Sequence, residues 1–320
     1  MKQFGWAVIG CGGIAEKIAG ELEKAGCGRI VACWNRTEAR AEAFAAKFGA
    51  KAYRTPEEAI TAEGVEGVYI ATTHDQHAHF TKLCLGHGVP VLCEKPFTVN
   101  LKEAEEVFEL AQKNGVYVAE AMWTWYNDHA RTVREWVKSG KVGEVKLVTA
   151  TFGYPMLETC TNLRLTSPEL IGGALMDIGV YPVRYMYELF GMPNSIHADG
   201  KLLGGVDTFE NIVMDYGTFQ ARLTVSIEHA LGELLVIEGT EGRIEVPDAH
   251  KAREGKLVGK YCDEFRFDAL LYATQFERVA EEIRSGKKES GYCPRRHTLD
   301  TMRLLDECRR QIGVVYPCEQ

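Results

Sequence analysis

The 320-residue chain has no long hydrophobic run, no internal repeat and no low-complexity stretch. A helix that spans a membrane needs about 20 mostly apolar residues, and a secretory signal needs an apolar stretch behind a basic start. The first apolar segment, residues 4–9, is short and is followed at once by glycines. We therefore expect a globular cytoplasmic protein with neither a signal peptide nor a membrane span.

The sequence also lacks an excess of positive charge. It has 37 lysines and arginines against 45 aspartates and glutamates, which gives a formal net charge of −8, and no basic stripe is visible. Proteins that bind nucleic acids or anionic membranes need clustered cations to neutralise phosphate groups. The charge therefore argues against both kinds of partner.

The ten cysteines include no Cys-x-x-Cys pair. Most lie within apolar runs, as expected of reduced and partly buried thiols. We therefore expect no disulfide framework and no zinc site, and the reduced thiols again favour the cytoplasm.

A chain of 320 residues is longer than one hydrophobic core usually serves. Six strands that alternate with helices predict an α/β domain over residues 1–120, with a doubly wound Rossmann sheet. From residue 145 the pattern changes to long alternating strands broken by glycines. Residues 121–320 are therefore expected to form an α+β domain with a large, mostly antiparallel open sheet, one face of which another subunit covers.

A glycine-rich turn follows the first strand. Residues 10–15 read Gly-Cys-Gly-Gly-Ile-Ala and lead into an amphipathic helix that reaches about Ala25. In this strand–turn–helix context, Gly10 makes the tight turn, Gly12 lets a pyrophosphate approach the backbone, and Ala15 allows the helix to pack closely on the strand. The segment predicts a dinucleotide site, with contacts from Gly10, Cys11, Gly12, Gly13 and Ile14.

The second strand ends at Asn35 and Arg36. Folds that select NAD usually carry an acidic residue near this tip, whereas an arginine accommodates the 2′-phosphate of NADP. The residues therefore favour NADP(H), with NAD(H) as the other candidate. Arg40 is a second candidate for the phosphate, and the alternative for Arg36 is an ordinary surface residue at a helix start.

The fourth strand is followed by Thr72-Thr73-His74-Asp75-Gln76-His77-Ala78-His79. Three histidines within six residues suggest a metal. No cysteine or carboxylate set at ligand spacing accompanies them, so we interpret this segment as a loop beside the cofactor. The expected cofactor contacts are Thr72, Thr73, His74 and His77, and no metal is predicted.

The fifth strand, residues 89–93, runs directly into Glu94-Lys95-Pro96. Ligands of open parallel sheets bind at the carboxyl ends of the strands, so this segment places a cation at the expected edge. Glu94 and Lys95 are therefore candidate site residues. The alternative is a solvated surface pair, which would contribute little to stability.

In the second domain, Gly172-Gly173-Ala174-Leu175 precedes a helix that includes Asp177 and Tyr181. If the helix runs through both, residues four apart share one face. Pro182 would kink a helix interior just beyond Tyr181. The alternative role for Tyr181 is that of a core residue with a satisfied hydroxyl group.

Together, Gly10-x-Gly12-x-x-Ala15, Glu94-Lys95-Pro96 and Gly172-Gly173-Ala174-Leu175-x-Asp177-x-Gly179-x-Tyr181 resemble the glucose–fructose oxidoreductase, inositol dehydrogenase and rhizopine catabolism family over nearly the whole chain. Residues 120–123 and 177–183 look most like the branch of dimeric dihydrodiol dehydrogenases and NADP-dependent D-xylose 1-dehydrogenases. Members of the inositol branch usually have His in place of Tyr181 and Asp in place of Arg184. These departures argue against inositol as the substrate. The Pro-Asn that often follows the fourth strand in the family is also absent here.

The resemblance implies that Lys95 stands beside the nicotinamide and the substrate oxygen, that Tyr181 donates or accepts a proton, and that Asp177 helps to place a sugar. A carbinol that loses hydride must also lose its hydroxyl proton, so a base is needed near that oxygen. A tyrosine, with an ordinary pKa of about 10, is a weak base at neutrality, and a nearby ammonium group favours its phenolate form. Either Lys95 or Tyr181 could make the direct transfer.

These residues predict an NADP(H)-dependent oxidoreductase that acts on a sugar, polyol or cyclic diol. Trp123 and Tyr126 are candidates to face the substrate ring, and the alternative is that they pack between the domains. Two other functions remain: cleavage of a glycosidic bond by transient oxidation with bound NAD, and a non-catalytic NADP sensor. The expected partners are a small carbohydrate or diol and further copies of the chain, in a dimer or tetramer.

Overall fold

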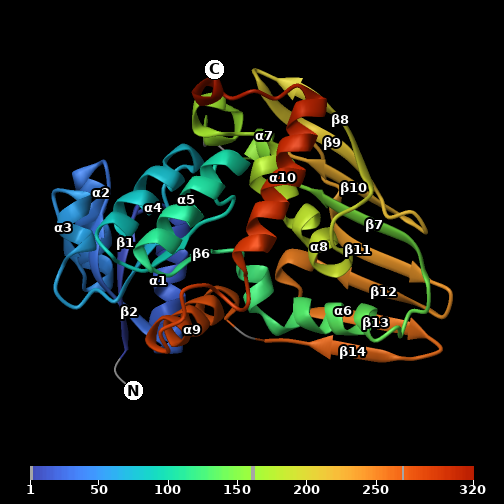
Figure 1. Ribbon diagram of the computed structural model, residues 1–320, viewed down its shortest axis with the longest axis horizontal. Helices are drawn as coiled ribbons and strands as arrows, with labels where there is room; N and C mark the ends of the chain where they lie inside the picture. The colour runs from blue at the N-terminus through green and yellow to red at the C-terminus, as the bar shows by residue number, and fades with distance from the viewer. Residues whose placement is uncertain (1–2, 160–162, 269) are drawn as a thin grey trace. The chain divides into compact units, whose positions relative to one another are not determined.

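The computed structural model describes residues 3–159, 163–268 and 270–320, which form two compact units (Figure 1). Unit 1 comprises Met1–Tyr126 and Ala269–Thr298, and unit 2 comprises Asn127–Asp268 and Leu299–Gln320. This division differs from the expected boundary at residue 120, because residues 269–298 return to the first unit.

Unit 1 contains a parallel sheet of six strands in the order β3-β2-β1-β4-β5-β6. The strands are β1 (Phe4–Ile9), β2 (Gly28–Trp34), β3 (Lys51–Ala52), β4 (Gly67–Ile70), β5 (Val91–Cys93) and β6 (Val118–Glu120). The strand order reverses between β1 and β4, and such a switch point is where ligands of open α/β sheets bind. The predicted doubly wound sheet is confirmed.

Capping side chains and glycines mark ends of the helices in unit 1. These helices are α1 (Gly13–Ala25), α2 (Glu38–Phe48), α3 (Pro56–Ile60), α4 (His77–Gly86), α5 (Leu101–Asn114) and α9 (Leu271–Arg284). The Asn100 side chain caps α5 by accepting from the backbone N–H of Glu103, and the helix ends at Gly115 in the left-handed conformation. Thr55 and Glu58 form a reciprocal capping box at the start of α3.

Helix α9 belongs to unit 1 because its side chains complete that core. The ring of Phe276 lies 5.0 Å from the ring of Trp6 on β1 and 5.0 Å from the ring of Tyr69 on β4. In the first turn of α9, the backbone N–H groups of Tyr272 and Ala273 donate to the Glu21 carboxylate of α1, at 2.9 and 3.1 Å. Such contacts join segments about 250 residues apart, so periodicity alone could not reveal them.

Unit 2 contains an eight-stranded sheet in the order β14-β13-β12-β11-β7-β10-β9-β8. The strands are β7 (Val145–Gly153), β8 (Ser195–Leu203), β9 (Val206–Asp215), β10 (Gln220–Ser226), β11 (Gly232–Gly239), β12 (Gly242–Pro247), β13 (Glu254–Gly259) and β14 (Asp263–Arg266). Only the β7–β10 pair is parallel within this sheet. The predicted large, mostly antiparallel sheet is confirmed.

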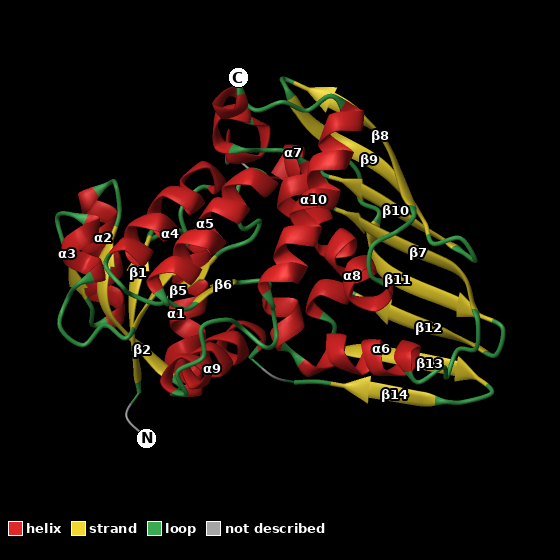
Figure 2. Ribbon diagram, in the orientation of Figure 1, coloured by secondary structure: helices red, strands yellow, loops and turns green. Residues whose placement is uncertain are grey.

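One face of this sheet is packed and the other is open. A row of paired residues runs across six strands, and each is buried: Ala198, Ile212, Leu223, Ala150, Leu235 and Val246. Helices α6 (Asp128–Lys138), α8 (Val180–Phe190) and the second half of α10 (Arg295–Ile312) lie on that face (Figures 1 and 2). In the part of unit 2 that the structure describes, no helix covers the opposite face. Unit 2 also includes the short helix α7 (Met156–Thr159).

Helix α8 is preceded without a break by a wider turn. Residues Leu175–Gly179 form a π-helix, and the backbone N–H of Val180 donates to the carbonyl oxygen of Leu175, five residues earlier. Pro182 is the third residue of α8, and it lacks the N–H that a helix interior needs. The helix therefore does run through Asp177 and Tyr181, with its wide turn just before the proline.

Among the described residues, no helix is both long enough and apolar enough to cross a membrane. Nine cysteines are free thiols, and all but Cys27, Cys262 and Cys318 are buried. Cys160 lies outside the described residues.

Candidate cofactor and substrate residues

In the glycine-rich turn of unit 1, the backbone at Gly10 passes close to the backbone at the end of β4. Gly10 has a φ of +98°, and a Cβ added there would lie 2.6 Å from the carbonyl oxygen of Ala71, which follows β4. A side chain would therefore be both strained and blocked at this position. The N–H of Cys11 donates to the side-chain oxygen of Asn35 at 3.1 Å, which ties the turn to the end of β2.

The next two glycines leave open space at the start of α1. A Cβ added at Gly12 or Gly13 would meet no atom within 4 Å, and no side chain caps the helix. Ile14 is half-buried behind them. The N-terminus of a helix with free backbone N–H groups favours an anion, so the turn fits the pyrophosphate of a dinucleotide.

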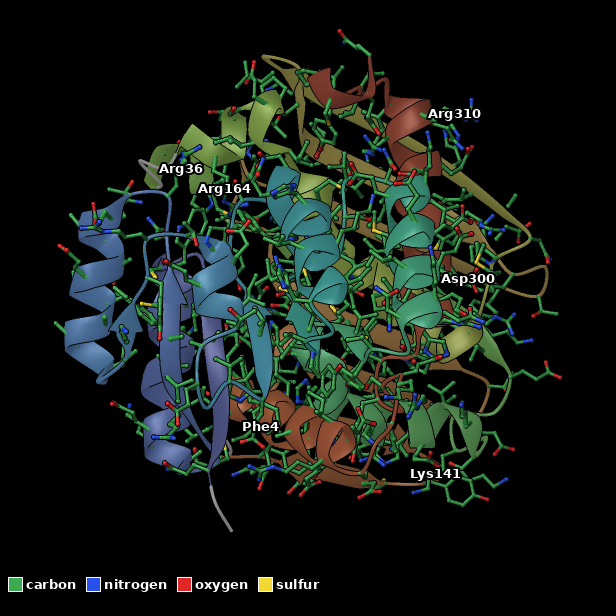
Figure 3. The ribbon with its side chains drawn as sticks, turned by 60° about the vertical axis from the view of Figure 1, so that its left-hand side comes forward. Phe4, Arg36, Lys141, Arg164, Asp300 and Arg310 are labelled. Carbon is green, nitrogen blue, oxygen red and sulfur yellow. The ribbon has the colours of Figure 1, made fainter. Side chains whose placement is uncertain are left out.

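The tip of β2 offers two exposed cations. In the described part of the chain, the side chains of Arg36 and Arg40 make no hydrogen bond or ion pair. Figure 3 shows Arg36 at the surface of unit 1. The amide group of Asn35 is occupied, because it also donates to the carbonyl oxygen of Thr37 at 3.1 Å. Asn35 thus shapes the loop through its own hydrogen bonds.

The loop after β4 is joined to the segment after β5 by a buried histidine. Nδ1 of His77 lies 2.8 Å from the carbonyl oxygen of Pro96, so it carries the proton and donates it. Burial lowers the pKa of His77 to about 4, which keeps the ring neutral at pH 7. His74 is also buried and its ring lies 5.5 Å from that of His77, whereas His79 is exposed.

The rest of this loop is half-buried, with Thr73 preceding a 3₁₀ turn at His74–Gln76 and Thr72 just before it. The described residues contain no group of three His, Cys, Asp or Glu side chains arranged to hold a metal ion. The expected cofactor contacts of Thr72, Thr73, His74 and His77 stay a prediction.

Glu94 anchors the segment that follows β5. Its buried carboxylate accepts the Tyr69 hydroxyl at 2.6 Å and the backbone N–H of Lys95 at 3.2 Å. Burial raises the pKa of Glu94 and, more strongly, that of Tyr69. Strand β5 and the Glu94 carboxylate therefore fix the backbone position of Lys95, whose side chain is half-buried.

Unit 1 brings its predicted cofactor residues to one edge of the sheet. Residues 10–14, 35–36, 72–77 and 94–95 follow β1, β2, β4 and β5, which are consecutive neighbours in the sheet order β2-β1-β4-β5. Because these strands are parallel, their carboxyl ends meet at the same edge. Arg40 lies further along, within α2.

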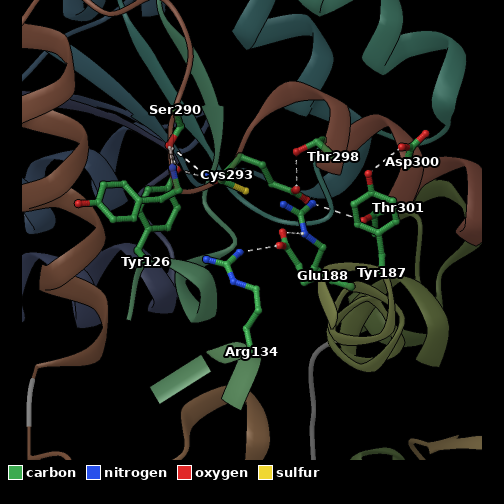
Figure 4. A network of polar contacts seen from close by, with 12 residues as sticks. Tyr126, Arg134, Tyr187, Glu188, Ser290, Cys293, Thr298, Asp300 and Thr301 are labelled. Carbon is green, nitrogen blue, oxygen red and sulfur yellow. Dashed lines mark hydrogen bonds and ion pairs between the residues drawn. The ribbon is translucent and has the colours of Figure 1, made fainter. Parts of the chain in front are cut away.

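The aromatic segment after β6 forms a 3₁₀ turn, Trp123–Tyr126, and all four residues are buried. The Tyr126 hydroxyl donates to the carbonyl oxygen of Glu120 or to the hydroxyl of Ser290, each at 3.3 Å (Figure 4). The ring of Trp123 lies 4.6 Å from that of Tyr272. Tyr272 was not among the sequence candidates, because α9 returns to unit 1 only through the fold.

In unit 2, Asp177 is paired with a residue that the motifs did not indicate. The Arg164 guanidinium donates to its carboxylate at 2.8 Å, and both side chains are largely buried. Arg164 lies in a short 3₁₀ turn, Leu163–Thr166, with no periodic pattern around it. Only its basic character, thirteen residues before Asp177, could have suggested it.

The double glycine before the π-helix makes room for a buried carboxylate. Gly173 has a φ of +117°, and a Cβ added there would lie 2.3 Å from an oxygen of Asp207 on β9. The other oxygen of Asp207 accepts the backbone N–H of Leu175 at 2.7 Å. Asp207 therefore caps the helix that carries Asp177 and Tyr181 from a neighbouring strand.

Tyr181 is 7% exposed and lies against aromatic rings of unit 2. Its ring centroid is 4.8 Å from that of His250 and 5.8 Å from that of Phe152. His250 was not a sequence candidate, because it lies 69 residues beyond Tyr181 in a turn without a recognisable motif.

Arg184 is fully buried and serves an internal ion pair. It donates to the Glu188 carboxylate at 2.9 Å, and Arg134 of α6 reaches the same carboxylate at 3.2 Å (Figure 4). Losing one partner of such a buried group leaves an uncompensated charge. The arginine at this position therefore has a structural role in unit 2.

Residues 4–122 match the family described as an oxidoreductase family with an NAD-binding Rossmann fold, GFO_IDH_MocA, and residues 130–245 match a GFO/IDH/MocA C-terminal domain. The chain belongs to the GFO/IDH/MocA oxidoreductase family. It is an oxidoreductase that uses a nicotinamide dinucleotide, and the open turn at Gly12 and Gly13 fits that cofactor.

Family members with nearly full-length similarity carry different substrate names. The chain is 31% identical to a protein named scyllo-inositol 2-dehydrogenase (NADP(+)) IolU from Bacillus subtilis (strain 168), over 98% of this chain and 99% of the relative. It is also 31% identical to trans-1,2-dihydrobenzene-1,2-diol dehydrogenase from Mus musculus, over 98% of both chains.

Solved structures share this fold over nearly the whole chain. The 3-ketoreductase KijD10 from Actinomadura kijaniata, in complex with NADP and TDP-benzene, matches 97% of this chain and 98% of its own, with a TM-score of 0.85 and 24% identity. An oxidoreductase from Desulfitobacterium hafniense matches with a TM-score of 0.85 and 21% identity, over 98% of this chain and 96% of its own.

Arg184, one of the two departures from the inositol branch, is buried inside unit 2. It forms an ion pair with Glu188. The expectation that inositol is not the substrate stays a prediction.

The open turn yields a prediction about cofactor binding. We expect Gly12→Ala to fold normally and to weaken NADPH binding by at least about tenfold, because the new methyl group fills space that the pyrophosphate needs. Gly20→Ala, also in open space but within α1, is the matched control and should leave binding unchanged. Fluorescence titration with NADPH measures both. Equal affinities of the two variants would contradict the assignment.

Proposed function

We propose that this family member is an NADP(H)-dependent oxidoreductase that moves a hydride between the nicotinamide and a secondary hydroxyl, or its carbonyl, on a sugar, polyol or cyclic diol. The observation that carries the proposal is the match along both units to relatives named for an inositol and for a cyclic diol. The retention of Lys95, Asp177 and Tyr181 in one chain supports it, since a sensor would need only the glycine turn.

The nicotinamide, when bound, accepts or donates the hydride. The backbone N–H groups at the start of α1 would hold its pyrophosphate, and Gly10 keeps that turn close to the end of β4. The Lys95 ammonium stabilises negative charge on the substrate oxygen as the carbinol proton leaves. Glu94 fixes the backbone of Lys95 through its carboxylate.

Tyr181 handles the proton. In the oxidation its phenolate accepts the hydroxyl proton, and in the reduction its neutral form returns a proton to the alkoxide. Lys95 favours the phenolate by its positive charge. Asp177, which Arg164 orients at 2.8 Å, accepts hydrogen bonds from neighbouring hydroxyl groups of the substrate.

Removal of either side chain should stop turnover without unfolding the protein. We expect Lys95→Ala and Tyr181→Phe to lower kcat by about 10²–10⁴-fold, the range for a lost proton-transfer group. Nicotinamide absorbance measures turnover with a panel of scyllo-inositol, D-xylose, glucose and a trans-dihydrodiol. Tyr187→Phe on the same helix, whose hydroxyl donates to Asp300 at 2.8 Å, is the control and should stay active. Turnover like that of the wild type in Lys95→Ala would refute the mechanism.

The same experiment separates the other two functions. A glycoside-cleaving enzyme with transient redox would release sugar with no net change in absorbance and would retain its cofactor through purification. A sensor would bind NADP and turn over none of the panel.

We also propose that Arg36 makes the protein prefer NADP(H). An exposed guanidinium at the end of β2 fits a 2′-phosphate, and this region carries no acidic residue before Glu38. Arg36→Ala should raise the Kd for NADPH by about tenfold or more and leave the Kd for NADH nearly unchanged. Arg54→Ala, which removes another exposed arginine near α2, controls for surface charge. An equal loss of affinity for NADPH and for NADH would contradict the assignment.

The open face of the large sheet is our candidate for self-association. A row of residues paired across neighbouring strands on this face consists of Val213, Arg222, Thr149 and Val236. Among the described residues, no helix covers it. We propose that a second copy covers this face. Light scattering should give at least twice the mass of 35.7 kDa, and Val213→Glu should lower it towards that mass. A monomer at micromolar concentration would refute the proposal.

A further inference from the structure

A short turn in unit 2 carries a histidine to the ring of Tyr181. Residues Ala249–Lys251 form a 3₁₀ turn, and the preceding Asp248 has a left-handed backbone with a φ of 50°. The Tyr185 hydroxyl, one turn after Tyr181 on α8, donates to the carbonyl oxygen of Ala249 at 2.8 Å. The turn is therefore held onto α8 beside Tyr181.

A buried carboxylate holds His250 at two points. One oxygen of Glu233, on β11, accepts the backbone N–H of His250 at 2.6 Å, and the other lies 2.5 Å from Nδ1 of its ring. The Glu233 side chain is 3% exposed and the His250 side chain 13%. The carboxylate accepts a hydrogen bond from Nδ1 of the ring, and its negative charge stabilises the imidazolium form of His250.

The other side of the imidazole faces aromatic rings. The ring of His250 lies 4.8 Å from that of Tyr181, at 47°, and 4.8 Å from that of Phe152, at 32°. These residues line one small hollow together with Glu233 and Tyr185. A cation against the face of an electron-rich ring is attracted to it, and more strongly to a phenolate.

Other titratable and charged side chains lie near the Glu233–His250 pair. His129 of α6 is buried next to the turn, and burial, followed by the charge of His250, lowers its pKa to about 4, so it is neutral. On the turn itself Lys251 pairs with Asp248 at 3.6 Å and lies over the ring of Tyr154. Arg253 follows on the same segment.

We propose that Glu233 and His250 are positioning residues that hold an imidazolium against the ring of Tyr181 and so favour its phenolate during proton transfer. The proposal rests on the proposed role of Tyr181 and adds a charge within unit 2 to that of Lys95. His250 acts through Tyr181, and Glu233 acts through His250.

The test is the pH profile of kcat/KM for oxidation of the best substrate in the panel. His250→Phe keeps an aromatic ring against Tyr181 and removes the charge, and Glu233→Gln keeps a bond to the turn and removes the carboxylate that stabilises the imidazolium. Because phenolate is the active form in oxidation, both variants should move the midpoint of the rise with pH upward by about one unit. His87→Phe, at an exposed position directly after α4 in unit 1, should leave it unchanged.

A purely structural role would give a different result. It predicts that His250→Phe retains the midpoint of the wild type, and that His250→Ala loses thermal stability with no change in midpoint. Either result in an active enzyme would overturn the inference and leave the proposed function standing. Loss of the proposed function would instead appear as full activity of Tyr181→Phe, whatever the profiles show.

Discussion

The close backbone approach at Gly10 is the constraint on which the cofactor side depends. The turn after β1 passes so near the end of β4 that an added Cβ would lie 2.6 Å from the carbonyl oxygen of Ala71. That approach directs the chain into α1 and leaves the first turn of this helix open towards the sheet edge. The loops after β2, β4 and β5 meet at the same edge. A buried histidine joins the segments after β4 and β5, and Glu94 joins the segment after β5 to strand β4.

Unit 2 relies on carboxylates that are buried and bonded. Asp207 caps the π-helix, Glu188 binds two arginines, and Glu233 binds both the backbone and the ring of His250. A buried charge without partners is costly, so each of these groups fixes the position of what it binds. The helix that carries Tyr181 is thereby fixed at its start, along its length and beside its aromatic ring.

Much of unit 1 could be predicted because its signals are local. The glycine turn, the alternation of strands and helices, and the segment Glu94-Lys95-Pro96 after a strand depend on neighbouring residues and on the geometry of parallel sheets. The return of residues 269–298 to unit 1 could not be predicted, because it depends on Phe276 meeting Trp6 across the sequence. A single boundary between two continuous segments cannot describe a unit made of two separate segments.

The sequence by itself determined the nucleotide fold, the family and the identities of Lys95, Asp177 and Tyr181 as candidates, because short motifs with fixed spacing encode them. Only the tertiary structure showed that Arg184 is buried in an ion pair, that Arg164 binds Asp177, and that Glu233 brings an imidazole to Tyr181. These pairings join separate elements of unit 2. No local pattern records them, since they exist only when the sheet and its helices pack.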